Sequence, residues 1–170
     1  DCAGRVARGD SQALSGEWVF GDVVVQQSID STDYIAGTGV AAEQFAVDVT
    51  ISLPPNDPEA GAGIIFHMAG RDDVANSQMV RFSQGGREIF WGNYDETRNF
   101  TGAGSMQLSL DWSLPHQLTI LTHSTTYDIL IDGEALVTDI PLLQDFGWIG
   151  LISYRGSVTF ENFELQLGRS

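Results

Sequence analysis

The sequence predicts an all-β protein folded as an antiparallel two-sheet sandwich, and three of its features support this fold class. Apolar residues recur with a period of two in one segment after another, most clearly in 45–53, as in a strand with one buried face. Turn-forming Gly, Pro and Asp residues separate these segments. No segment carries the apolar stripe of an amphipathic helix. Many short strands without helices are typical of an antiparallel sandwich.

The predicted strands follow one another along most of the chain. They lie within 17–28, 45–53, 61–69, 77–83, 88–93, 106–112, 116–123, 127–132, 134–140, 147–154 and 157–167. Asp132-Gly133 predicts a two-residue hairpin turn, because this dipeptide tolerates positive φ angles. We therefore interpret Asp132 as a turn residue and not as a catalytic residue. In the last strand the apolar positions change parity, which predicts a β-bulge near Glu161 and Asn162.

One glycine-rich segment has the spacing of a dinucleotide-binding loop. Gly37–Ala42 reads GTGVAA, but it leads into the strand predicted over 45–53. A dinucleotide-binding loop instead leads into a helix, whose N-terminus holds the pyrophosphate. We therefore expect Gly37–Ala42 to be an inter-strand loop.

Length and charge limit the classes of function. The 170 residues suit a single domain. The formal net charge is −15, and all basic residues are Arg. Without Lys, neither the phosphate-binding loop ending in Gly-Lys-Ser/Thr nor a Schiff-base enzyme is possible. Such an acidic surface disfavours nucleic acid as a partner. No apolar run reaches the length of a membrane span, so we expect no membrane insertion.

Two segments of the sequence resemble the concanavalin A-like lectin and glucanase superfamily, in particular its laminin-G-like jelly rolls. They are PHQLTILTHSTTYDILIDGEALV, residues 115–137, and GWIGLISYRGSVTFENFEL, residues 147–165. The earlier segments FAVDVTISL and GAGIIFHM are similar to two early strands of the same family. The resemblance covers about residues 17–167 and implies a jelly-roll sandwich, for which we predict a domain of residues 17–170. Residues 1–16 lack sustained periodicity and are predicted to form an N-terminal arm. The resemblance indicates fold far more than activity, because lectins, carbohydrate-binding modules, adhesion domains and glycosidases share this fold.

A ligand-binding site is predicted in the segment Phe90–Gly104, where aromatic residues alternate with amide, carboxylate and guanidinium groups. Aromatic rings stack on the apolar face of a sugar, while the polar groups bind its hydroxyls. Trp91 has a second interpretation, as a core residue that ends a strand. The turn SYRG is predicted to supply another wall of the site. The candidate residues are Trp91, Asn93, Tyr94, Asp95, Arg98, Tyr154 and Arg155.

Metal binding and catalysis have weaker candidates. Asp72, Asp73 and Asn76 could bind calcium in a loop, but an acidic solvated loop is the preferred interpretation, so no cofactor is predicted. Hydrolases of the resembled superfamily commonly carry Glu-x-Asp-x-x-Glu or Glu-x-Asp-x-Glu on one strand, and this chain has neither pattern. Glu161 and Glu164 are three residues apart, so a regular strand would place them on opposite faces, unless the predicted bulge intervenes.

The expected function is that of an extracellular or cell-surface recognition module without catalytic activity, binding carbohydrate or a cell-surface glycan. The acidic, Lys-free composition favours an extracellular location. Two alternatives remain. The chain could be a structural subunit whose arm contacts other copies, with Cys2 forming an intermolecular disulfide in a homo-oligomer. It could also be a glycoside hydrolase-like enzyme, whose carboxyl pair would come from Glu43, Glu88, Asp95, Glu96, Glu161 and Glu164.

Overall fold

The computed structural model describes residues 12–13, 18–19, 23–55, 57–71 and 73–168, and within these ranges all regular structure is β-strand. The strands are β1 (Gln12–Ala13), β2 (Trp18–Val19), β3 (Val23–Ala42), β4 (Phe45–Ser52), β5 (Gly61–Met68), β6 (Gln78–Ser83), β7 (Glu88–Tyr94), β8 (Phe100–Gln107), β9 (His116–Thr122), β10 (Thr126–Ile131), β11 (Glu134–Pro141) and β12 (Gly147–Leu167). All pair in antiparallel fashion, which confirms the predicted all-β fold class.

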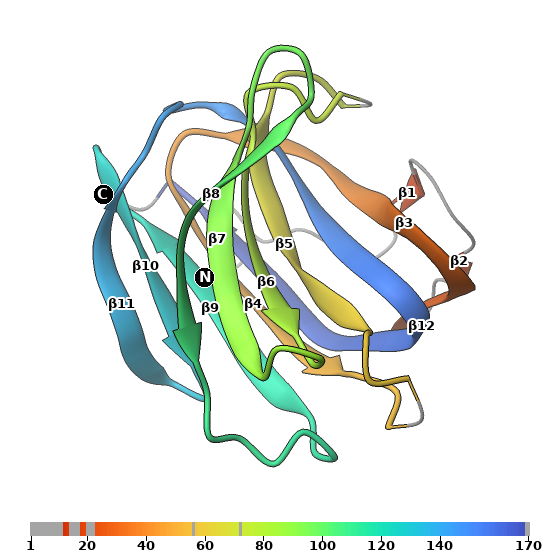
Figure 1. Ribbon diagram of the computed structural model, residues 1–170. Coiled ribbons are helices and arrows are strands. Elements are labelled where there is room, and N and C mark those ends of the chain that lie inside the picture. The colour runs from red at the N-terminus through yellow and green to blue at the C-terminus, as the bar shows by residue number, and fades with distance from the viewer. Residues whose placement is uncertain (1–11, 14–17, 20–22, 56, 72, 169–170) are drawn as a thin grey trace.

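Two long strands link the layers of the sandwich. The first half of β12 pairs with β5, through Trp148–Tyr154, and its second half pairs with β4, through Thr159–Leu167. Strand β3 pairs with β12 along both halves. We call β5 to β8 with the first half of β12 the front layer, and β4, β9, β10 and β11 with the second half of β12 the back layer (Figure 1).

The hydrophobic core lies between the two layers. Strand β4 shows the predicted alternation, with every second residue buried from Phe45 onward. The ring of Phe66 packs edge-on against those of Phe45 and Tyr127, at centroid distances of 5.6 and 5.0 Å. Aliphatic residues from both layers complete this core, among them Val47, Ile51, Ile64, Val80, Leu118, Ile129, Leu151 and Phe160.

Two local predictions are confirmed by the backbone. Asp132 and Gly133 have φ angles of 51° and 84°, and Ile131 pairs with Glu134 across this tight turn. Between Glu161 and Glu164 the pairing of β12 with β4 shifts, and Asn162 has a φ of 53°. The shift is the predicted β-bulge, and it moves Phe163 and Leu165 into the parity that the apolar pattern indicated.

Two other element predictions were wrong. Gly37–Ala42 is no loop, because it belongs to β3 and pairs with β12. A strand was predicted over 106–112, whereas β8 covers Phe100–Gln107. β8 is an edge strand paired only with β7 among the described residues, so it has little buried surface and no alternation that the sequence could show. The following apolar residues pack on the core from an irregular segment.

Part of the predicted N-terminal arm lies on the chain's own sandwich. Gln12 and Ala13 form β1 and pair with Gly37 and Ala36 of β3. Residues 1–11, including Cys2, lie outside the described residues, so the predicted arm-mediated assembly stays a prediction. In the described part of the chain there is no helix long and apolar enough to cross a membrane.

Candidate functional site

The hairpin of β7 and β8 separates the predicted aromatic residues onto two faces. Side chains alternate along β7, so Trp91 points inward and packs against the core, while Tyr94 points outward. A Cβ added to Gly104 would lie 2.5 Å from the ring of Trp91, so glycine allows this close packing. Asn93 has the same parity as Trp91 and pairs with Gln78 and Thr101. The structure therefore gives Trp91 the position described by its alternative interpretation, in the core.

The polar residues at the tip of this hairpin bind one another. One carboxylate oxygen of Asp95 accepts hydrogen bonds from the Thr97 amide at 2.8 Å, the Thr97 hydroxyl at 2.7 Å and the Asn99 amide at 3.0 Å. These bonds, led by that of Asn99, hold the pKa of Asp95 below its ordinary value. Arg98 has a φ of 67° and donates two hydrogen bonds of 2.8 Å to the carboxylate of Asp73. Asp95 and Arg98 thus shape the loop.

The same ion pair involves Asp73, a residue of the loop for which calcium binding was the weaker alternative. Asp73 also accepts a hydrogen bond from the Ala75 amide, and this bond and the Arg98 guanidinium lower its pKa. Asp72 lies outside the described residues. Among the residues that the structure describes, no group of three or more His, Cys, Asp or Glu side chains is arranged to hold a metal ion.

Tyr154 and Arg155 do not meet the β7–β8 hairpin tip. Tyr154 pairs with Gly61, which pairs with Ser83, which in turn pairs with Glu88 at the start of β7. Tyr94 ends β7, so the two predicted walls lie at opposite ends of the front layer. Arg155 has a φ of 61°, and its Nε lies 3.4 Å from a carboxylate oxygen of Asp57.

Tyr154 instead forms a row with two residues that were not among the candidate site residues, Arg81 and Phe90. The guanidinium carbon of Arg81 lies 4.9 Å from the ring centroid of Phe90 and 5.0 Å from that of Tyr154. Arg81 pairs with Phe90 on one side and with Gly63 of β5 on the other. A Cβ added to Gly61 would lie 3.3 Å from the Nε of Arg81, so the bare glycine leaves room for the arginine.

Further partly exposed aromatic rings cover the rest of this surface. Tyr94 and Phe100 make an edge contact with centroids 5.3 Å apart, and the guanidinium of Arg71 lies 5.3 Å from the ring of Trp148. Beneath them is a second buried cluster, formed by Ile35, Ile65, Met68, Met79 and Ile152. We call this surface the outer aromatic face, and define it by Arg71, Arg81, Phe90, Tyr94, Phe100, Trp148 and Tyr154.

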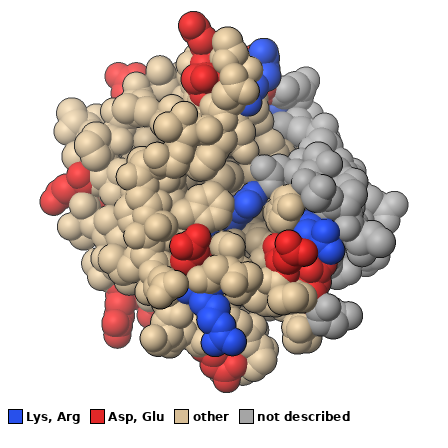
Figure 2. All heavy atoms as spheres, in the orientation of Figure 1, with Lys and Arg blue, Asp and Glu red and all other residues tan. Residues whose placement is uncertain are grey.

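Charged groups are sparse on the side of the molecule that Figure 2 shows. Uncharged groups cover most of it, and acidic and basic side chains lie in small separate groups rather than in one patch. On the outer aromatic face the guanidinium groups of Arg71 and Arg81 lie over rings, so cationic polar groups and ring surface lie side by side. This combination of apolar ring surface and polar donors is suited to a ligand with both apolar and hydroxylated surfaces.

The candidate catalytic pair lies on the other layer. The β-bulge changes the parity, so that Glu161 pairs with Thr50 and Glu164 pairs with Asp48, two residues on the outward side of β4. Glu161 and Glu164 therefore share one face, as the predicted bulge allows. That face is the outward side of the back layer, and Asp48 there accepts a hydrogen bond from the Thr119 hydroxyl.

The comparisons with known proteins show a shared fold. No family model matches this sequence, and no curated protein does. A carbohydrate-binding module from Bacillus subtilis, CBM66, matches with a TM-score of 0.81 and 11% identity, over 92% of this chain and 95% of that one. A β-glucanase from Bacillus licheniformis matches with a TM-score of 0.69 and 10% identity, over 98% and 94% of the two chains.

A structure with a bound glycan is also similar to this chain. The exoplasmic/lumenal domain of VIP36, in a form bound to Ca²⁺ and Man3GlcNAc, matches with a TM-score of 0.69 and 11% identity, over 98% of this chain and 90% of that one. At such identities the comparison concerns fold alone. The protein has the concanavalin A-like jelly-roll fold that the sequence resemblance implied.

Proposed function

We propose that this protein is a non-catalytic recognition module that binds a saccharide on its outer aromatic face, outside the cell. The observation that carries the proposal is the row Phe90–Arg81–Tyr154, in which one guanidinium lies within about 5 Å of two partly exposed rings. The presence of a carbohydrate-binding module and of a domain bound to Man3GlcNAc among similar folds supports the class of ligand.

The chemistry of the row fits a sugar chain. An aromatic ring packs against the C–H groups of a pyranose, and a guanidinium donates hydrogen bonds to its hydroxyls. The contacts of Arg81 with both rings hold its side chain in place, so less conformational entropy is lost on binding. From β12 to β7 the row crosses three strand spacings, or about 14 Å. That span suits an oligosaccharide of about three residues rather than a single sugar.

The distribution of carboxyl groups favours binding over hydrolysis. Glycoside hydrolysis commonly needs two carboxyl groups on either side of the scissile bond, about 5 to 10 Å apart. At the outward positions of β5 to β8 and the first half of β12, all of which are described, the acidic residue is Glu88 alone. Glu161 and Glu164 lie on the opposite layer. Within these strands one outward acid does not make the usual pair, and the acid next to them is Asp33 of β3, whose backbone pairs with Tyr154.

A glycan array tests the proposal, with affinities then measured for the best ligand. The variants Phe90→Ala and Tyr154→Ala should each weaken binding by about tenfold or more, because truncation of a central aromatic contact commonly costs over 1 kcal/mol. Phe146→Ala is the matched control, since Phe146 is an exposed phenylalanine that is not among the residues that define this face. Absence of binding to every glycan, or equal affinities in all variants, would overturn the proposal.

A further inference from the structure

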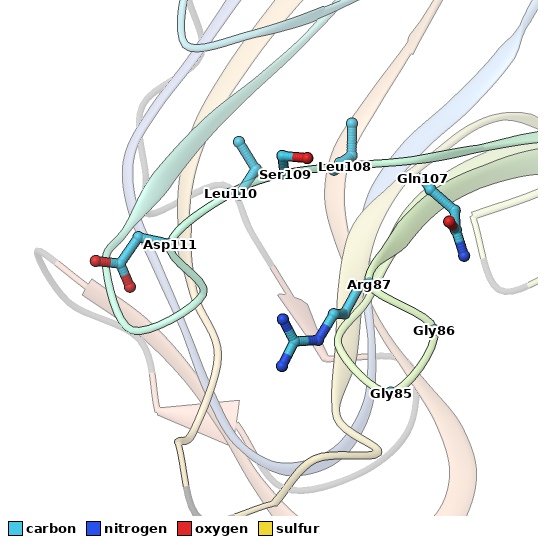
Figure 3. A pocket seen from close by; sticks show the side chains of 8 residues that line it. All are labelled: Gly85, Gly86, Arg87, Gln107, Leu108, Ser109, Leu110 and Asp111. Atoms are coloured by element: carbon cyan, nitrogen blue, oxygen red, sulfur yellow. The ribbon is translucent and has the colours of Figure 1, made fainter.

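A cavity outside the outer aromatic face opens at the end of the sandwich where β6 turns into β7. Its volume is about 670 Å³, and it lies between the turn that carries Gly85, Gly86 and Arg87 and the segment 107–111 (Figure 3). A second cavity of about 420 Å³ shares Gly85 and Arg87 and reaches Trp112. We call the two together the rim pocket. Figure 3 shows the Arg87 side chain extending into the space between the two segments.

The frame of the rim pocket is held by hydrogen bonds. The side-chain amide of Gln84 donates to the carbonyls of Pro54 and Asp57 at 3.1 and 3.0 Å. The amide of Leu108 donates to the carbonyl of Arg87 at 2.8 Å, which ties the segment after β8 to the turn. The amide nitrogen of Gln84 is fixed by its two acceptors, so its oxygen Oε1 is also fixed.

Two shielded polar atoms in this wall lack a hydrogen-bond partner among the described residues. They are Oε1 of Gln84, an acceptor, and Nε1 of Trp112, a donor. Such atoms are uncommon in native proteins, and an unseen water, ion or ligand is a usual explanation. Both atoms have almost no exposed surface, so they lie behind the surface of the pocket and do not face a ligand directly.

Arg87 is also distinctive among the described arginines. Arg98 and Arg155 pair with Asp73 and Asp57, and Arg71 and Arg81 lie over aromatic rings. The exposed guanidinium of Arg87 makes no ion pair, hydrogen bond or ring contact with any residue that the structure describes. It is therefore a free cation within the rim pocket, and a carboxylate is its natural bidentate partner.

We propose that the rim pocket is a second saccharide site, selective for a uronic acid residue whose carboxylate pairs with Arg87. The inference rests on the proposed function for the class of ligand, and uses different residues. The carboxylate lies in the smaller cavity, where Arg87 is the charged lining residue and Trp112, Pro55 and Pro58 provide apolar walls. The hydroxyls of the same or the next sugar lie in the larger cavity.

The acidic residues near the larger cavity explain why the ligand carboxylate is placed in the smaller one. Asp111 lines the larger cavity, and in Figure 3 its carboxylate points away from Arg87. Its hydrogen bonds with the side chain and backbone of Ser113 hold its pKa below the ordinary value, so it remains ionised. The carboxyl group of Glu88 lies close to Gly86, a residue that lines the same cavity. Both acids would repel a carboxylate there, and both accept hydrogen bonds from hydroxyls.

The test titrates the intact protein with trigalacturonic acid, while NMR follows the indole N–H signals. The signal of Trp112 is identified by its loss in Trp112→Phe. We expect saturable binding that shifts the Trp112 signal, and binding of the methyl-esterified trimer that is weaker by about tenfold or more. Arg87→Gln should reproduce this loss with the acid, and Arg98→Gln, the matched control at an exposed arginine outside both sites, should leave the affinity within about twofold.

The outcomes separate this inference from the proposed function. If the acid fails to bind, if its ester binds equally well, or if Arg87→Gln binds like wild type, the rim site is rejected. Tyr154→Ala should leave the affinity for the acid within about twofold. If Tyr154→Ala abolishes uronate binding, the ligand lies on the outer aromatic face and the rim site is rejected while the proposed function stands. If the wild-type protein binds no glycan at all, both the rim site and the proposed function are rejected.

Discussion

The guanidinium of Arg81 lies 5.0 Å from the ring centroid of Tyr154, although a whole strand, β5, separates the strands that carry them. Gly61 and Gly63 make this contact possible, because a side chain at either position would rise into the path of the arginine or into the neighbouring backbone. The arrangement depends on the packing of three strands, and it yields a direct test.

Gly63→Ala should destabilise the protein strongly. A Cβ at this position would lie 1.8 Å from the backbone carbonyl oxygen of Val80, so β5 and β6 must separate. Overpacking of this kind costs about 1–3 kcal/mol or more, measured as the loss of unfolding free energy in urea. The control is Gly102→Ala, where an added Cβ meets nothing within 4 Å. Equal stabilities of the two variants would contradict the described packing of β5 on β6.

Trp91 and Tyr94 should respond differently to truncation. Trp91 packs on the inter-layer core, so Trp91→Ala should lower the unfolding free energy by about 2–4 kcal/mol. Tyr94 lies on the outer aromatic face. Tyr94→Ala should therefore weaken glycan binding and lower the unfolding free energy less than Trp91→Ala does. Urea denaturation and glycan affinity, measured on both variants, check this division. A Trp91→Ala protein of unchanged stability would show that Trp91 is not part of the core.

Asp132→Ala should destabilise the hairpin between β10 and β11. The carboxylate of Asp132 accepts a hydrogen bond from the Gln117 amide at 2.9 Å and lies 2.8 Å from Nδ1 of His116, and the residue has a positive φ. Alanine loses these interactions and is strained at this φ, so we expect a loss of about 1–3 kcal/mol in thermal or urea unfolding. Glu134→Ala, at the exposed first residue of β11, is the control. If both variants lower the unfolding free energy equally, the carboxylate contacts of Asp132 do not stabilise the hairpin.

The stability of the protein should depend on pH through His67. Burial lowers the pKa of His67, whose Nε2 lies 2.9 Å from the carbonyl oxygen of Glu43. Because the folded-state pKa lies below the unfolded value of about 6.5, the unfolded chain takes up the proton first as the pH falls. The contribution of neutral His67 to the free energy of unfolding is fully present above about pH 6.5, and it declines as the pH falls toward the folded-state pKa.

Urea unfolding at about pH 7.5 and about pH 5 measures this effect, since histidine is the side chain whose ordinary pKa lies between them. His67→Asn should remove much of the difference between the two conditions, because asparagine does not titrate and tolerates the φ of 57° at this position. His123→Gln is the control, with an exposed histidine. If His67→Asn keeps the wild-type pH dependence, another group causes it.

Local structure in this protein follows from the sequence wherever one strand or one turn is enough to specify it. The alternation in β4 predicts its buried face, Asp132-Gly133 predicts its hairpin, and the parity change near Glu161 predicts the bulge. In each case the signal is contained within a few consecutive residues, because a strand has a side-chain period of two and a tight turn needs particular φ angles.

Only the tertiary structure decides which segments distant in the chain share a surface. Tyr154 was predicted to be a wall of the site, but its partners Arg81 and Phe90 come from β6 and β7, and strand order and register bring them together. Trp112 and Arg87 likewise meet at the rim pocket through the pairing of β7 with β8. Register depends on long-range hydrogen bonding and on burial of both layers, which a single stretch of sequence does not contain.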